Sequence, residues 1–125
     1  MTENEIGKIV VDCALKVHRA LGPGLLESAY VACIQHELKK SSLMVNSQVA
    51  LPIIYDGVKI ESGYRLDLLI EEKVVIEAKS VEALNDVHLA QMITYLKLSG
   101  LKLGFLINFN VKMIKNGIKR VVNHL

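Results

Sequence analysis

Three charged residues interrupt the most apolar part of this chain, and they limit what it can fold into. The runs 64–70 and 74–79 are short and rich in aliphatic residues, with the polar segment 71–73 between them, which is typical of a β-hairpin. Asp67 lies in the first run, and Glu77 and Lys79 lie in the second. Burying an unpaired charge costs several kcal/mol unless a partner or a metal compensates, so these residues point to chemistry rather than packing.

The two-residue period of a β-strand predicts how these side chains are arranged. Glu77 and Lys79 share one face of their strand, and Val74 and Ile76 share the other. Asp67 is expected opposite Glu77 or within one position of it, so the hairpin has an apolar face and a charged face. Opposed residues of an antiparallel pair lie about 4.5 to 5.5 Å apart at Cβ, near enough for two carboxylates to share a hard cation.

A third carboxylate is expected from an upstream helix. The glycines and proline of segment 22–24 end one helix and begin another, which places Glu27 in the first turn of the second helix. Its simpler role there is to complement the helix dipole. We favour an inward-pointing Glu27, because at helical spacing it heads the apolar stripe of Tyr30, Val31, Ile34 and Leu38.

The size and composition of the chain predict one domain spanning residues 1–125. Its 125 residues are 51% hydrophobic, with a mean hydropathy of +0.33, which is enough for a single core. No apolar stretch reaches the roughly 20 residues of a membrane span, and residues 1–5 lack the basic start of a signal peptide. We therefore expect a cytoplasmic protein without a membrane partner, in which Cys13 and Cys33 are reduced structural thiols.

The charge pattern allows a nucleic-acid partner but does not require one. The net charge is +2, and the chain has no Trp, two Phe and four Tyr, so contact with a nucleic acid is expected through backbone phosphates rather than stacking. A set of basic residues either meets phosphates or forms an ordinary solvated surface. It comprises Lys39, Lys40, Lys97, Lys102, Lys112, Lys115, Lys119 and Arg120.

Hydrophobic periodicity and turn residues predict the order of the remaining elements. A capping box formed by Thr2 and Glu5 starts the first helix, and Gly100 ends the third. The third helix is expected to carry one stripe, formed by Leu84, Val87, His88, Gln91, Tyr95 and Leu98. The expected helices are 2–22, 25–40 and 81–99, and the expected strands are 48–55, 58–70 with a bend at 62–63, 74–79, 103–108 and 118–122.

This order of elements, with acids on a helix and on two adjacent strands, resembles the PD-(D/E)XK nuclease superfamily. Asp67 followed by Glu77-x-Lys79 matches its signature, although Leu66 stands where the first motif usually has proline. The helix that follows carries Gln91-x-x-x-Tyr95, as in the exonuclease-like and resolvase-like branches. Within the superfamily the chain is similar to the GxxExxY family, whose name is spelled by Gly24-x-x-Glu27-x-x-Tyr30.

The resemblance implies a fold of the α/β (α+β) class with a restriction-endonuclease-like core. In this core helices flank a central mixed β-sheet in the order ααβββαβ(β). It also implies hydrolysis of phosphodiester bonds in DNA, assisted by Mg²⁺ or Mn²⁺ and connected with repair, recombination or defence. Asp67, Glu77, the backbone carbonyl of Ala78 and Glu27 are the expected metal ligands, and Lys79 orients the attacking water or offsets charge in the transition state.

The other candidate residues carry a functional and a structural interpretation side by side. Gln91 is expected to be catalytic, by hydrogen bonding to the water, the phosphate or Lys79. Tyr95, Tyr30 and His88 are candidates for substrate binding, yet tyrosines at helical spacing are commonly core aromatics and His88 suits a helix surface. Glu77 and Lys79 also fit an ion pair on an exposed sheet face.

Two functional classes follow. The first is a metal-dependent nuclease in which Asp67, Glu77, Lys79 and Gln91 are catalytic, and a homodimer is one way for so small a domain to address both strands of DNA. The second is a non-catalytic or partner-activated module that binds nucleic acid or another protein and retains the nuclease fold.

Overall fold

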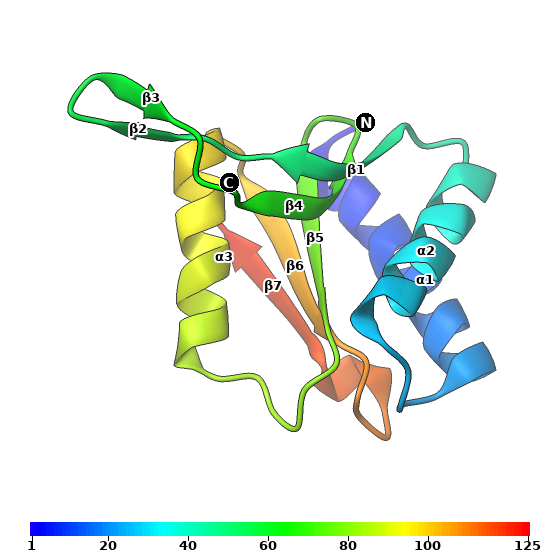
Figure 1. Ribbon diagram of the computed structural model, residues 1–125. Coiled ribbons are helices and arrows are strands. Elements are labelled where there is room, and N and C mark those ends of the chain that lie inside the picture. Colours follow the sequence, from blue (N-terminus) through cyan, green and yellow to red (C-terminus); the bar gives the residue numbers. More distant parts are fainter.

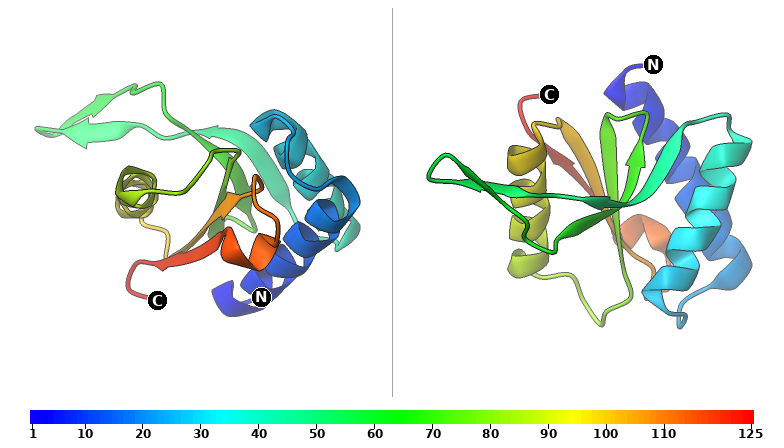
Figure 2. Two further views of the ribbon diagram at one scale, coloured as in Figure 1. Left: turned by 90° about the horizontal axis from the view of Figure 1, so that it is seen from below. Right: turned by 45° about the horizontal axis from the view of Figure 1, so that its top comes forward.

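The computed structural model describes residues 1–125 as a sheet layered between helices (Figure 1). The sheet has five strands in the order β1-β4-β5-β6-β7. Helices α1 and α2 cover one face of the sheet and α3 covers the other, as two further views also show (Figure 2). The helices are α1 (Glu3–Leu21), α2 (Glu27–Lys40) and α3 (Asp86–Ser99), with one 3-10 turn, η1 (Ile114–Asn116). The strands are β1 (Val45–Ala50), β2 (Ile53–Tyr55), β3 (Val58–Ile60), β4 (Arg65–Ile70), β5 (Val74–Lys79), β6 (Leu103–Asn108) and β7 (Ile118–Val122).

The direction of the strands makes the sheet mixed, as predicted. Strands β1, β4 and β5 form an antiparallel meander, β5 pairs in parallel with β6 through the α3 crossover, and β7 pairs antiparallel with β6. The order of the elements in the main layers is therefore ααβββαββ, which agrees with the restriction-endonuclease-like arrangement expected from the sequence.

Two hydrophobic clusters hold these layers together. Because side chains alternate along a strand, β6 contributes Phe105 and Ile107 to the cluster under α1 and α2, and Leu106 to the cluster under α3. Every residue of β6 is buried. This continuous apolar run is typical of a strand covered on both faces.

The first two helices follow the predicted pattern closely. Thr2 and Glu5 form the expected capping box at the start of α1, and Gly22 ends it with a φ of 66°. Cys13 is buried, Cys33 is half-buried, and both are free thiols. None of the three α-helices is long and apolar enough to cross a lipid bilayer.

The predicted strand 48–55 is wrong, because the chain leaves the main sheet in its middle. Strand β1 begins earlier, at Val45, and pairs with β4, whereas β2 pairs only with β3. Pro52 has no N–H to donate to a sheet, and the N–H of Leu51 is already bonded to the carbonyl of Tyr64 at 3.0 Å. The β2–β3 ribbon consequently projects from the body of the molecule (Figures 1 and 2).

The third helix starts five residues later than predicted, and its buried face is different. Asn85 caps α3 by accepting the N–H of His88 at 3.0 Å. The residues that it packs into the core are Met92, Tyr95 and Leu96. The predicted stripe does lie on one side of the helix, since five of its six members line one groove, but Tyr95 is the one buried among these five, and Val87 is 74% exposed. That side of α3 lines an open groove instead of the core.

Candidate active site

Asp67 and Glu77 lie where the pairing of β4 with β5 ends. The last paired residues are Leu68 and Ile76, and continuation of that register sets Asp67 opposite Glu77, as the sequence predicted. Beyond this point the carboxylates cross between the strands. The N–H of Asp67 donates to Glu77 Oε1 at 3.0 Å, and the N–H of Ala78 donates to Asp67 Oδ2 at 2.9 Å.

The charged face expected for this hairpin is in fact largely buried. Glu77 is only 6% exposed, and Val75 on the same face of β5 packs into the cluster under α3. Only the end of the strand is polar. The third helix covers this face because Met92 and Leu96 turn toward it.

Burial raises the pKa of both carboxyl groups. Desolvation is the largest cause of the rise in the pKa of Asp67. Desolvation followed by the charge of Asp67 raises the pKa of Glu77 to about 8. The nearby Lys79 ammonium lowers the pKa of both groups, but by less. Two carboxyl groups held in this way favour a bound proton or a bound cation.

Lys79 is half-buried beside these acids and makes no ion pair with either of them. Its carbonyl accepts the N–H of Phe109 at 2.9 Å, on the β6 side of the strand. Successive residues of a strand direct their backbone groups to opposite sides, and the Ala78 N–H does reach Asp67. The Ala78 carbonyl therefore faces the same side as the acids, where it can serve as an oxygen ligand.

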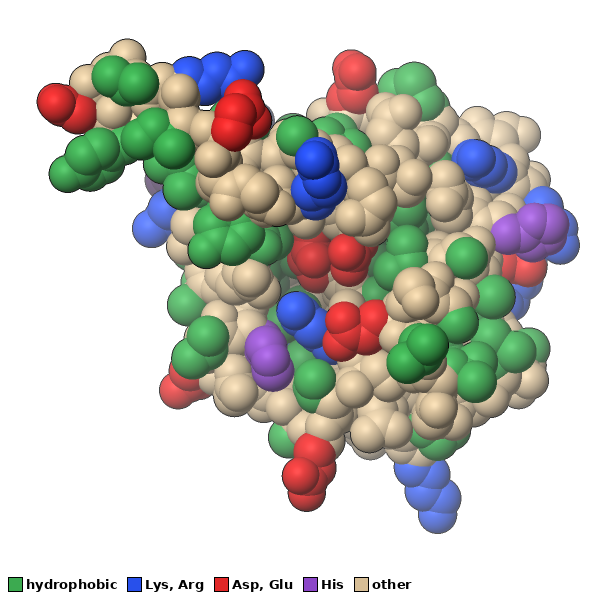
Figure 3. Space-filling model, viewed as in Figure 1, with side chains coloured by type: hydrophobic (Ala, Val, Ile, Leu, Met, Phe, Trp, Pro, Cys, Tyr) green, Lys and Arg blue, Asp and Glu red, His purple; other side chains and the backbone are tan.

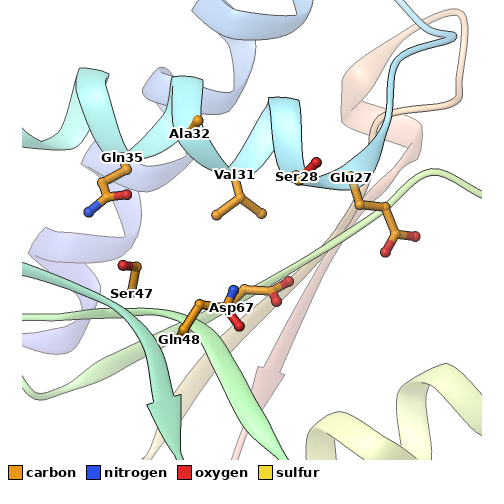
Figure 4. A pocket seen from close by; sticks show the side chains of 8 residues that line it. All are labelled: Glu27, Ser28, Val31, Ala32, Gln35, Ser47, Gln48 and Asp67. Carbon is orange, nitrogen blue, oxygen red and sulfur yellow. The ribbon is translucent and has the colours of Figure 1, made fainter.

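The prediction that Glu27 is an inward-facing member of a buried stripe is wrong. Glu27 is exposed at the first position of α2, and its Oε2 accepts the N–H of Ser80 at 3.0 Å. Its carboxylate nevertheless raises the pKa of Asp67 slightly, so the two groups are close. Glu27 and Asp67 line one hollow of about 360 Å³ (Figure 4).

Tyr30 has a structural role in this arrangement. The side chain is 0% exposed and its ring stacks on Phe109 with the centroids 4.4 Å apart. The hydroxyl donates to the carbonyl of Gly22 at 2.6 Å and accepts the N–H of Leu25 at 3.1 Å. Tyr30 thus holds the loop that presents Glu27, and this placement favours packing over the substrate contact that the sequence suggested.

Two residues that were not among the predicted site residues hold the segment that follows the acidic strand β5. The Ser80 hydroxyl donates a hydrogen bond to the carbonyl of Leu25 at 2.8 Å, in addition to the hydrogen bond from the Ser80 N–H to Glu27. Asn108 is buried, and its side chain bonds to both backbone groups of Val81, at 3.1 and 3.0 Å. A serine just after a strand or an asparagine at the end of one has no periodic signal, so only the fold reveals these contacts.

The remaining candidates lie along one groove on α3. Gln91, Tyr95 and His88 line it together with Lys79. The Gln91 side chain makes no hydrogen bond within the protein. The pKa of Tyr95 is raised to about 12, chiefly by burial and then by the charge of Glu77. His88 Nδ1 accepts the N–H of Asn85 at 3.2 Å, so this histidine also caps its helix.

The three acids do not meet at one point as their side chains are placed, since no three potential ligand groups gather closely enough to hold a metal. Each carboxylate accepts a backbone N–H in this arrangement. The donor set still fits a divalent cation of the magnesium type, because it consists only of oxygen atoms and two of its acids have raised pKa values. Figure 3 shows acidic and basic side chains gathered in a hollow on this face of the molecule.

A family model described as the PD-(D/E)XK nuclease superfamily matches residues 4–121. The chain belongs to the PD-(D/E)XK nuclease superfamily. No curated protein and no solved structure gave a match. Membership in this superfamily indicates a phosphodiester hydrolase of the nuclease type, which acts on nucleic acid. PD-(D/E)XK nucleases usually use divalent metals such as Mg²⁺.

Proposed function

We propose that this PD-(D/E)XK protein is a metal-dependent deoxyribonuclease of the GxxExxY branch, related to repair, recombination or defence. One observation carries the proposal. Glu77 is buried, Asp67 is half-buried, both have raised pKa values, and they lie beside Lys79, an amine without an ion-pair partner. Structural ion pairs neutralise each other, whereas this arrangement leaves its acids and its amine available for a substrate.

The metal ligands in this proposal are Asp67, Glu77, the Ala78 carbonyl and Glu27, for Mg²⁺ or Mn²⁺. A bound divalent cation polarises a phosphate and lowers the pKa of a bound water. Lys79 is near Asp67 and Glu77 and would offset the charge that develops on the phosphate oxygens during attack. Gln91, with no partner in the protein, hydrogen-bonds to the attacking water, the phosphate or Lys79.

The test is cleavage of plasmid and linear DNA with Mg²⁺ or Mn²⁺, compared with the same reaction in a chelator. Lys79→Ala and Glu77→Gln are expected to lower kcat at least about a hundredfold, as the loss of a group that stabilises the transition state does. Lys102→Ala is the matched control, because Lys102 is exposed and precedes β6 at the opposite end of the sheet. Full activity in the Lys79→Ala variant would reject this site.

The chain contains one such site, so a homodimer would be needed to cut both strands of a duplex in one binding event. Sedimentation of the protein with and without DNA measures this directly. A second candidate function is a partner-activated module that binds nucleic acid without cutting it. The observation that favours it is that each of the three carboxylates accepts a backbone N–H and that the three do not gather at one point. Calorimetric uptake of Mn²⁺ without cleavage of any nucleic acid would support this second function.

A further inference from the structure

A groove of about 630 Å³ extends along α3 from Lys79 to the base of the β2–β3 ribbon. Its walls include Ile53 at the start of β2, Tyr64 before β4, and Val87 and Leu98 on α3. Six of its ten lining residues are hydrophobic, although the groove is open to solvent. Figure 3 shows hydrophobic side chains beside the hollow that holds the charged ones. Neither the metal ligands nor the packing of the core accounts for this surface.

We propose that the groove binds an unpaired nucleobase next to the phosphodiester that is cut, so that the substrate is single-stranded or locally unpaired nucleic acid. This inference rests on the proposed nuclease function and names its substrate class. Lys79 belongs to both the groove and the acidic site, so a phosphate at Lys79 places its adjoining base in the groove.

Tyr64 supplies the stacking surface. Its side chain is 47% exposed, and its ring is tilted at 55° to the ring of Tyr95 with the centroids 5.9 Å apart. Tyr95 is itself buried, so it supports Tyr64 from the side of the core. The low aromatic content of the sequence argued against a stacking platform, but one supported tyrosine is sufficient for one base.

Polar groups suited to the edge of a base lie in the same groove. The Gln91 amide offers both a donor and an acceptor and bonds to nothing in the protein. His88 uses Nδ1 to cap α3, which leaves Nε2 without a protein partner. Nucleobases present donors and acceptors side by side, so these groups complement an unpaired base.

The distribution of charge argues against a duplex as the occupant. Lys79 is the one Lys or Arg among the residues that line this groove and the neighbouring hollow, and that hollow contains the carboxylates of Glu27 and Asp67. Proteins that hold DNA by its backbone neutralise about 6 to 10 phosphates. Affinity at this site therefore depends on the base rather than on the backbone.

The experiment measures binding by fluorescence anisotropy, with Ca²⁺ in place of Mg²⁺ to limit cleavage. The probes are a short single-stranded DNA and the same sequence as a blunt duplex. A further set of single strands each lacks one base, at a different position along the DNA. Wild type is expected to bind the single strand at least about tenfold more tightly than the duplex. The slope of log K against log salt is expected near about −1, since few phosphates are contacted.

Tyr64→Ala is expected to weaken single-strand binding about tenfold, as the loss of one base–aromatic stack does. Removing the one base that stacks on Tyr64 should weaken binding by the wild type to the same extent. It should not change binding by Tyr64→Ala. Tyr55→Ala is the matched control, because Tyr55 is 69% exposed on the ribbon and does not line the groove. If Tyr64→Ala is unstable, Val87→Glu blocks the groove from an exposed position, with Val58→Glu on the ribbon as its control.

Equal or tighter binding of the duplex, or unchanged binding by Tyr64→Ala and Val87→Glu, would overturn the groove assignment while metal-dependent cleavage still stands. If wild type neither binds nor cuts any nucleic acid, the proposed function fails, and the inference fails with it.

Discussion

Asp67 and Glu77 differ from the other acids of this chain because each carboxylate accepts an N–H from the opposite strand. These two bonds replace the ladder bonds that a regular hairpin would make at this point. Desolvation nevertheless outweighs them, since the pKa of each group is raised. The acids are thus part of the sheet and are also electrostatically strained, which is a combination typical of a functional site.

The raised pKa of Glu77 predicts how the stability of the metal-free protein depends on pH. A carboxyl group with a pKa of about 8 in the folded state and an ordinary value when unfolded binds its proton more tightly in the folded state. Stability should therefore fall as pH rises from about 5 to 8, at about 3 °C of Tm per kcal/mol. Calorimetry in a chelator measures this, and Glu77→Gln should flatten the curve. A wild-type Tm that rises over this pH range would contradict the assignment, and so would a Glu77→Gln Tm that still falls over it.

Tyr30 allows a second prediction at the scale of one atom. Tyr30→Phe removes the hydroxyl that bonds to Gly22 and Leu25, so unfolding free energy should drop by about 1 to 2 kcal/mol. The loop that presents Glu27 should loosen, and kcat should fall while far-UV circular dichroism is unchanged. Urea unfolding measures the first effect. Tyr55→Phe, on the exposed ribbon, should change neither quantity.

Among the elements, the β2–β3 ribbon is the least connected to the rest of the fold. It forms a two-stranded sheet of its own, and its turn at Asp56 and Gly57 has the positive φ angles, 53° and 72°, that a tight hairpin requires. Its base is closed by the Ser62 hydroxyl, which donates to the carbonyl of Leu51 at 2.7 Å. The ribbon can therefore be removed without opening the main sheet.

Replacing residues 53–61 by a short glycine-containing turn is expected to leave Tm within a few degrees of wild type. Thermal unfolding measures this outcome. The same deletion removes the Ile53 wall of the groove, so binding of single-stranded DNA should weaken although the fold remains. A large loss of Tm would show that the ribbon supports β1 or β4.

The sequence predicted elements well where one hydrophobic period decided the outcome. The first helix was predictable because its apolar residues repeat at helical spacing up to Gly22, and β5 and β6 because each is a short apolar run next to a turn. The division of 48–55 and the late start of α3 were missed, although Pro52 and the capping residue Asn85 are visible in the sequence, because apolar residues continue on both sides of each position. The position of Glu27 was also set by a distant partner, Ser80, which a linear pattern does not contain.

At the scale of the molecule, the two hydrophobic clusters share one sheet and should unfold together. Neighbouring residues of β6 reach opposite clusters: Leu106 packs under α3, and Ile107 packs under α1 and α2. Leu106→Ala and Ile107→Ala are each expected to lower unfolding free energy by about 2 to 5 kcal/mol. Both should give one cooperative transition in urea, observed equally by circular dichroism and tyrosine fluorescence. Two separated transitions would reject a single domain spanning residues 1–125.

The two bonds that the Asp67 and Glu77 carboxylates accept across the strands also allow the activity to be lost without loss of the fold. Glutamine at position 77 and asparagine at position 67 retain the carbonyl oxygen that accepts each N–H, but neither can carry a negative charge. Replacement of one carboxylate oxygen by nitrogen would then abolish the hydrolytic activity while the sheet keeps its shape. Lineages that lose the reaction in this way would inherit an intact scaffold, free to be recruited for recognition alone.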